Sequence, residues 1–72
     1  MEWFFRSRVG TWRIRAHGGR FVAMWEDESL GSYHTPEAAL DDLVGGHTWS
    51  PSSGADSSKA GLPDALSEWA RR

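Results

Sequence analysis

The chain lacks cysteine and any long apolar run. Without cysteine, neither disulfide bonds nor a cysteine-rich zinc site can stabilise the fold. No stretch reaches the length of a membrane span, and residues 3–5 are too few for the apolar region of a signal peptide. A chain of 72 residues has room for one hydrophobic core. We therefore expect a cytoplasmic, single-domain protein with no membrane partner.

Signatures of catalysis and of metal binding are also missing. The three histidines, His17, His34 and His47, do not have the spacing of a metal site. No serine, histidine or aspartate lies in a recognisable catalytic motif, and a small chain with a filled core leaves little volume for a substrate pocket. We expect no enzymatic activity, no metal, no cofactor and no small-molecule substrate.

Aromatic residues, in contrast, are abundant. A domain this small must bury most of its apolar surface to be stable, and each aromatic ring hides about 150–250 Å² when it is buried. We therefore predict that most of these rings build the core before any of them serves as a binding surface. They are Trp3, Trp12, Trp25, Trp49, Trp69, Phe4, Phe5, Phe21 and Tyr33.

Residues 3 to 34 have the two-residue period that is typical of β-strands. On the second expected strand, Trp12, Ile14 and Ala16 share one side, and Arg13 and Arg15 share the other. Glycines after His17 supply the positive φ angles of a hairpin turn, and a glycine at position 31 predicts either a bulge or the close packing of another element. The expected strands are 3–8, 11–16, 20–25 and 29–34.

A short helix follows the strands. Thr35 is a good N-cap residue, Pro36 suits the first helical position, and the glycines at 45 and 46 predict the C-terminal end. Apolar residues at positions 39, 40, 43 and 44 form one stripe. A helix of about ten residues does not persist alone, so we expect it to pack on the sheet.

The remainder of the chain has a different composition. Residues 47–61 are rich in serine and glycine and predict a flexible loop. Residues 62–72 begin near Pro63, and Leu62, Leu66 and Trp69 recur with helical spacing. We predict an α+β fold: a three- to four-stranded antiparallel meander with one helix on one face (residues 1–46), then the long loop and a short C-terminal helix, all in one domain.

Two segments, GTWRIR at residues 10–15 and LGSYHTPEAALDD at residues 30–42, carry a family resemblance. The chain resembles, over residues 4–44, the plant ethylene-response (Apetala-type) DNA-binding domain and the integrase arm-binding domains. There, a strand with tryptophan and a Leu-Gly-aromatic strand precede a Thr-x-Glu-Ala-Ala helix. The matching positions are Gly10, Trp12, Leu30, Gly31, Tyr33, Thr35, Glu37, Ala38 and Ala39. The resemblance implies that arginines on the exposed sheet face read the DNA major groove.

Charge is unevenly distributed, although the formal net charge is only −2. Residues 1–20 contain five arginines and one acid, whereas residues 26–42 contain six acids and no base. Aligned arginines on neighbouring strands repel one another unless an anion lies over them. That anion could be nucleic acid, an acidic partner or the C-terminal segment of the chain itself; the alternative is a solvated polar face. The candidate binding residues are Arg6, Arg8, Arg13 and Arg15.

The acidic residues form a second candidate surface. Glu26, Asp27 and Glu28 lie at an expected hairpin tip, and with Asp41 and Asp42 they are a candidate protein-binding edge. The alternative is that a charged hairpin tip only keeps the protein soluble.

Two tryptophans are candidate aromatic anchors for a partner. Trp25 ends a strand beside acids, and Trp49 stands at the start of the loop. We predict a small, non-catalytic bacterial accessory or interaction protein that binds another protein, or itself, through these charged surfaces. The alternative is a nucleic-acid-binding domain that uses an arginine-lined sheet face.

Overall fold

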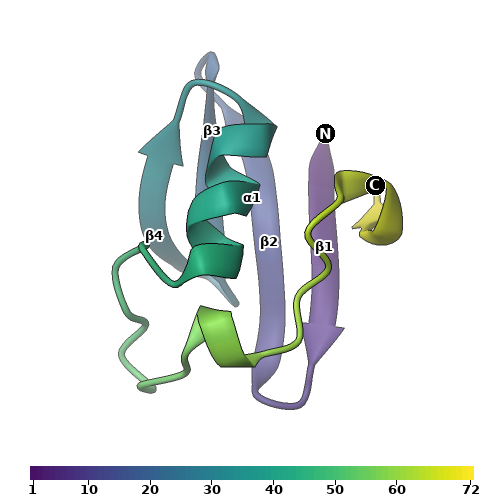
Figure 1. The fold of residues 1–72 in the computed structure, drawn as a ribbon. Helices are drawn as coiled ribbons and strands as arrows, with labels where there is room; N and C mark the ends of the chain where they lie inside the picture. Colours follow the sequence, from purple (N-terminus) through teal and green to yellow (C-terminus); the bar gives the residue numbers. More distant parts are fainter.

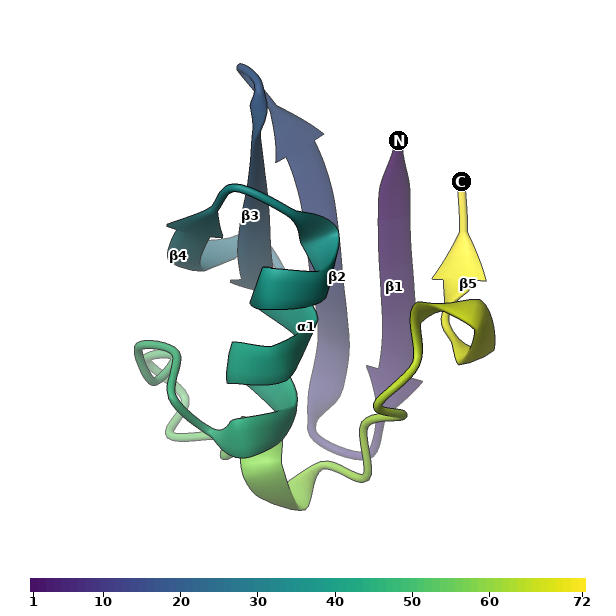
Figure 2. The same cartoon turned by 45° about the horizontal axis from the view of Figure 1, so that its top comes forward.

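Four strands follow one another along the chain as an antiparallel meander. The computed structural model describes residues 1–72, and its strands are β1 (Glu2–Ser7), β2 (Gly10–His17), β3 (Arg20–Trp25) and β4 (Glu28–Tyr33). A fifth strand, β5 (Ala70–Arg71), pairs with β1, so that the strand order is β4-β3-β2-β1-β5 (Figures 1 and 2). One helix, α1 (Pro36–Gly45), packs across this sheet. The predicted α+β class is confirmed, and each of the four expected strands begins and ends within one residue of its prediction.

The turns follow the predicted glycines. Gly18 and Gly19 adopt φ angles of 58° and 80° between β2 and β3, as a tight hairpin requires. The β3–β4 register shifts at Ala23 and Met24, so β4 has a bulge where Gly31 predicted one. Because side chains alternate between the two faces of each strand, this register decides which residues face the helix.

Helix α1 begins and ends where the sequence predicts. The Thr35 hydroxyl accepts a hydrogen bond from the Ala38 backbone N–H at 3.1 Å, and Pro36 occupies the first turn. Gly46 takes a left-handed conformation with a φ of 74°, and its N–H bonds to the carbonyl groups of Asp42 and Leu43. Local chemistry therefore sets both ends of this helix.

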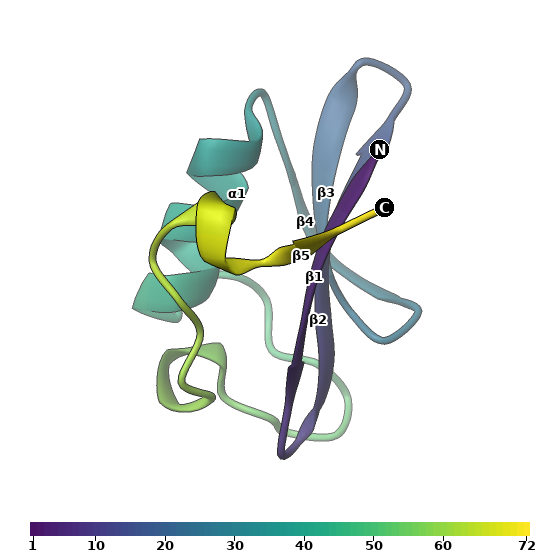
Figure 3. The ribbon, with the colours of Figure 1, turned by 90° about the vertical axis from the view of Figure 1, so that its right-hand side faces the viewer.

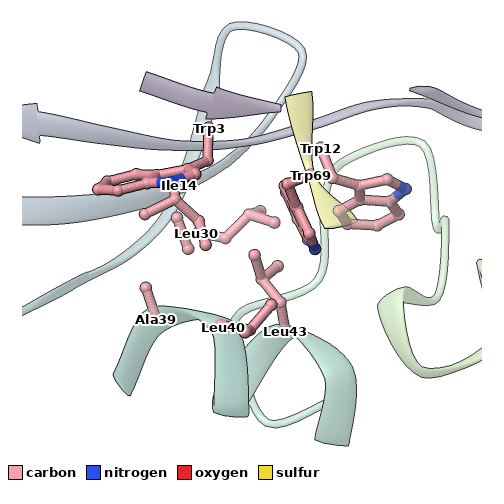
Figure 4. Close-up of a cluster of buried hydrophobic side chains, with 9 residues drawn as sticks. Trp3, Trp12, Ile14, Leu30, Ala39, Leu40, Leu43 and Trp69 are labelled. Carbon is pink, nitrogen blue, oxygen red and sulfur yellow. The ribbon is translucent and has the colours of Figure 1, made fainter. Parts of the chain in front are cut away.

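The core lies between α1 and one face of the sheet. Trp12, Ile14 and Leu43 are completely or almost completely buried, and Trp3 and Trp69 close the side next to β5. Figure 4 shows the strand side chains pointing toward the apolar stripe of α1. Trp12 and Ile14 thus face the helix as predicted, which turns Arg13 and Arg15 to the opposite face.

The C-terminal segment differs from the predicted helix. Residues 62–72 contain only a 3-10 turn, η2 (Leu66–Glu68), and then strand β5. Leu62, Leu66 and Trp69 do pack on the core, but Trp69 has extended backbone angles, and its indole N–H donates to the Pro63 carbonyl at 3.0 Å. Strand β5 pairs with β1 and so satisfies backbone N–H and C=O groups along the β1 edge of the sheet. A C-terminal helix would leave these groups unpaired. The sheet accordingly has five strands rather than three or four.

Residues 47–61, predicted as a flexible loop, have no regular element except η1 (Ser57–Lys59). The Trp49 backbone N–H donates to the Leu30 carbonyl at 3.1 Å, and the Glu28 carboxylate accepts from the Ser52 N–H and hydroxyl at 2.9 Å. Ser57 is buried against the rest of the protein. These contacts place the segment along the β4 edge and the C-terminal end of α1.

All the non-strand segments that cover the sheet lie on one side of it. Viewed edge-on, α1 and the chain from η1 to η2 occupy one face, whereas the inter-strand turns and part of the loop after α1 extend toward the other (Figure 3). We call the uncovered side the outer face. None of the helices has the length and the apolar character needed to cross a membrane.

Candidate functional site

The outer face carries five arginines, four on strands β1 to β3 and one, Arg72, directly after β5. The β1–β2 and β2–β3 registers align its residues in rows across the sheet, because directly paired residues point to the same side. One row runs from Arg72 through Glu2 and Arg15 to Val22, and the next places Phe4 beside Arg13 and Met24. We define the arginine face as Arg6, Arg13, Arg15, Arg20 and Arg72, together with the residues between them.

A buried carboxylate organises this face. Glu2 is only 7% exposed, and its Oε1 accepts a hydrogen bond from Arg13 Nη2 at 3.0 Å. Arg15 Nε lies 3.9 Å from the same oxygen, and Arg72 Nε lies 3.7 Å from Oε2, which is buried without a hydrogen bond. Backbone hydrogen bonds in both directions, each 2.9 Å long, join Glu2 to Arg72. One carboxylate therefore holds three guanidinium groups that would otherwise repel one another.

Arg13 connects this centre to the β3–β4 turn. Its Nη1 donates to Asp27 Oδ1 at 3.2 Å and to the Glu26 carbonyl at 3.1 Å. The hydrogen bond that Arg13 donates to Glu2, aided by the charges of Glu2 and Asp27, raises the pKa of Arg13 above its usual value. Arg13 is therefore charged at every physiological pH, but most of its hydrogen-bonding capacity is used within the protein.

Glu26 holds the turn against β2. It is the only non-glycine residue with a positive φ, at 51°. Its backbone N–H donates to the Thr11 carbonyl at 2.8 Å, and its carboxylate accepts from the Thr11 N–H at 2.7 Å. These bonds offset the cost of the unusual backbone and keep Glu26 beside the arginines.

The remaining arginines lie nearer to solvent. The guanidinium groups of Arg72 and Arg6 lie 4.4 and 5.8 Å from the centre of the Phe4 ring, a cation–π arrangement. Arg20 donates to the hydroxyl and carbonyl groups of Ser32, at 2.6 and 3.1 Å. A shallow depression of about 200 Å³ lies between Arg6, Arg13, Arg72 and the two glutamates.

Three of the four predicted arginines therefore share the outer face. Arg6, Arg13 and Arg15 lie on it, whereas Arg8 is exposed in the turn between β1 and β2. The sequence interpretation missed Arg20 and Arg72, which complete the face, and the structural role of Glu2.

The alternation of Glu2, Phe4 and Arg6 against Trp3 and Phe5 was a signal for Glu2 and Phe4. It places both residues on the side that carries the arginines, where the structure has them. No local signal identified Arg72, because it reaches the face only through pairing with the start of the chain.

The five acids of the predicted edge separate into two places. Glu26, Asp27 and Glu28 surround the β3–β4 turn, and each makes a contact within the protein. Asp41 and Asp42 lie on α1, where Asp42 accepts a hydrogen bond from the Tyr33 hydroxyl at 2.9 Å. Burial and this carboxylate raise the pKa of Tyr33 to about 12.

The two predicted aromatic anchors have different surroundings. Trp25 is half-buried, packs against the core and donates its indole N–H to the Val9 carbonyl at 3.0 Å. Trp49 is 81% exposed beside the β4 edge. Of the two, only Trp49 presents its ring to solvent.

The histidines do not form a cluster. His17, His34 and His47 are all exposed, at the end of β2, before α1 and after α1. No three histidine, aspartate or glutamate side chains come together in a way that would hold a metal ion.

Comparison with protein-family models, with curated proteins and with solved structures finds no match for this chain. The resemblance to the ethylene-response and integrase arm-binding domains therefore stays a prediction.

Proposed function

We propose that this chain is a small, non-catalytic accessory protein that binds an acidic surface of another protein through its arginine face. One observation carries the proposal: the outer face presents five arginines, and neither α1 nor the chain from η1 to η2 covers it (Figure 3). Glu2 and Phe4 together contact four of them, so less side-chain entropy is lost when a partner binds.

The acids within the face favour a protein partner over nucleic acid. Glu2 lies at the centre of the arginines, and Asp27 is paired with Arg13. A phosphate backbone would meet these carboxylates as well as the arginines, whereas the acidic side chains of a protein can pair with individual guanidinium groups. A mixed-charge face also rejects partners whose charges do not match.

Nucleic-acid binding is the second candidate. Arg6, Arg15 and Arg20 favour it, because none of them has a carboxylate within hydrogen-bonding distance and all three face solvent. Contacts from three arginines predict a weak, non-specific interaction whose affinity falls as salt is added.

Direct titration separates the two candidates. Fluorescently labelled polyglutamate, duplex DNA and single-stranded RNA are each titrated with the protein at low and at physiological salt, and anisotropy reports binding. We expect binding to polyglutamate that persists at physiological salt and is lost in Arg15→Glu. Arg8→Glu is the matched control, because it makes the same charge change outside the arginine face.

Arg15→Ala repeats the test without placing a second carboxylate beside Glu2. The proposal is wrong if polyglutamate fails to bind, or if Arg8→Glu weakens binding as much as Arg15→Glu. Binding to DNA or RNA alone, with a salt dependence that Arg15→Ala reduces by about one unit of slope, supports the second candidate instead.

A further inference from the structure

The shallow depression on the arginine face is lined entirely by polar and charged side chains. Its volume is about 200 Å³. We call it the arginine depression. Because no apolar side chain lines it, a ligand would bind there through charge and hydrogen bonds rather than through burial of apolar surface. The lining residues are Glu2, Arg6, Thr11, Arg13, Glu26 and Arg72.

Three of these residues have hydrogen-bond donors that the protein does not use. Arg6 forms no ion pair or hydrogen bond, and Arg72 forms one ion pair through its Nε, which leaves its two Nη groups free. The Thr11 hydroxyl also lacks a partner, and the β1–β2 register sets Thr11 directly opposite Arg6. The Phe4 ring positions both guanidinium groups, at 5.8 and 4.4 Å from its centre. Two guanidinium groups and a hydroxyl around one small space suit an oxyanion.

Two carboxylates in the lining are held in place. The Glu2 side chain is only 10% exposed, and it accepts the 3.0 Å hydrogen bond from Arg13. Glu26 is held by its two hydrogen bonds to Thr11, at 2.8 and 2.7 Å. The lining therefore has three positive charges and two fixed negative charges. A ligand group with one negative charge balances this set, whereas a dianion meets both carboxylates with too little positive charge to compensate.

This balance distinguishes the two kinds of anionic side chain that a partner protein can present. An aspartate or glutamate carries one negative charge, whereas a phosphorylated residue carries about 1.5–2 at pH 7. We propose that the arginine depression receives one aspartate or glutamate side chain of the partner, held by Arg6, Arg72 and Thr11, and that Glu2 and Glu26 select it over a phosphorylated residue. This role rests on the proposed function, because the carboxylate belongs to the acidic partner that the arginine face binds.

Two pairs of variants test the two parts of this role. Arg6→Gln removes a guanidinium group from the depression, and its control, Arg8→Gln, removes one from the neighbouring turn. Glu26→Gln removes a negative charge from the lining but keeps an oxygen that can accept from the Thr11 N–H. Its control, Glu28→Gln, removes the same charge at the same turn outside the depression. Anisotropy measures the affinity of each protein for labelled polyglutamate and for labelled polyphosphoserine of equal length.

We expect Arg6→Gln to weaken the binding of polyglutamate about fivefold, and Arg8→Gln to weaken it less than about twofold. Glu26→Gln should raise the ratio of the affinity for polyphosphoserine to that for polyglutamate at least about threefold. The reason is that a dianion gains more than a monoanion when a negative charge leaves the lining. Glu28→Gln should change this ratio less than about 1.5-fold. Circular dichroism checks that each variant is folded, as we expect for the exposed Arg6, Arg8 and Glu26.

Equal effects of Arg6→Gln and Arg8→Gln on polyglutamate binding would overturn this role, and so would equal ratios for Glu26→Gln and Glu28→Gln. If polyglutamate binding is still lost in Arg15→Glu, the function of the arginine face holds, and only the depression is excluded as the carboxylate site. Polyphosphoserine binding that falls in Arg6→Gln, with no change of ratio in Glu26→Gln, would assign the depression to a phosphorylated residue instead. Wild-type protein that does not bind polyglutamate would contradict the proposed function, and this role with it.

Discussion

Replacing Glu2 by glutamine tests whether one carboxylate organises the arginine face. Glutamine keeps the shape of the side chain and one carbonyl oxygen, but it removes the negative charge. Arg13 then loses its 3.0 Å ion pair, and Arg15 and Arg72 lose their attraction to the same group. Three positive charges remain close together on the sheet, so the folded state should become less stable.

The size of the effect follows from burial. A hydrogen bond to a charged group contributes about 1.5–3 kcal/mol to stability. The Arg13 side chain is 20% exposed and keeps its bond to Asp27 in the variant. We therefore expect Glu2→Gln to lower the free energy of unfolding by about 1.5 kcal/mol, the lower end of this range. In a domain of this size, a loss of 1 kcal/mol lowers the melting temperature by about 4–8 °C. Glu2→Gln should therefore melt about 6–12 °C below the wild-type protein.

Thermal unfolding followed by circular dichroism measures this difference. Asp27→Asn is the matched control, because Asp27 also pairs with Arg13 but its side chain is fully exposed. We expect a much smaller change for Asp27→Asn, as for most exposed ion pairs. A melting temperature for Glu2→Gln within about 2 °C of the wild-type value, or above it, would refute the organising role of Glu2.

Three further predictions concern the fold. Gly10→Ala should lower the free energy of unfolding, measured with denaturant, by at least about 2 kcal/mol, because the φ of Gly10 is 132° and a Cβ would lie 2.5 Å from the Trp25 indole. Gly54→Ala is the control: Gly54 has a φ of 81° but open space around it, so the loss should be only about 1 kcal/mol. The phenol of Tyr33, the only tyrosine, should ionise near pH 12 in the folded protein and near pH 10 after unfolding, as ultraviolet absorbance would show. Because folding raises this pKa, the contribution of Tyr33 to stability should be constant below about pH 10 and should be lost as the pH rises toward 12, a loss that Tyr33→Phe removes. Thr35→Ala should cost about 1 kcal/mol through loss of the N-cap, and an unchanged unfolding midpoint would contradict that role.

Local signals were sufficient to predict the meander and the helix. Alternation of apolar and polar residues assigned Trp12 and Ile14 to the helix side, and Thr35 and Gly46 mark the two ends of α1. These features depend on residues a few positions apart, so they can be read from a single sequence.

Long-range pairing could not be predicted in this way. The spacing of Leu62, Leu66 and Trp69 shows only that these three residues pack on the same side of the segment. An irregular segment that ends in a strand can place them on the core as well as a helix can. Strand β5 depends on backbone bonds between Glu2 and Arg72, at opposite ends of the sequence. For the same reason, the sequence indicated an arginine-lined face but not the central position of Glu2 within it.

Site-specific photo-crosslinking tests most directly whether the arginine face binds a protein. A photoreactive amino acid replaces Val22, which lies beside Arg15 on the outer face, and in a separate variant it replaces Asp41, on the exposed side of α1. Both variants are irradiated in cells that produce the chain, and the adducts are identified by mass spectrometry. We predict an adduct with an acidic protein from position 22 that is absent from position 41 and disappears with Arg15→Glu. Nucleic-acid adducts from position 22, or equal protein adducts from both positions, would contradict the account.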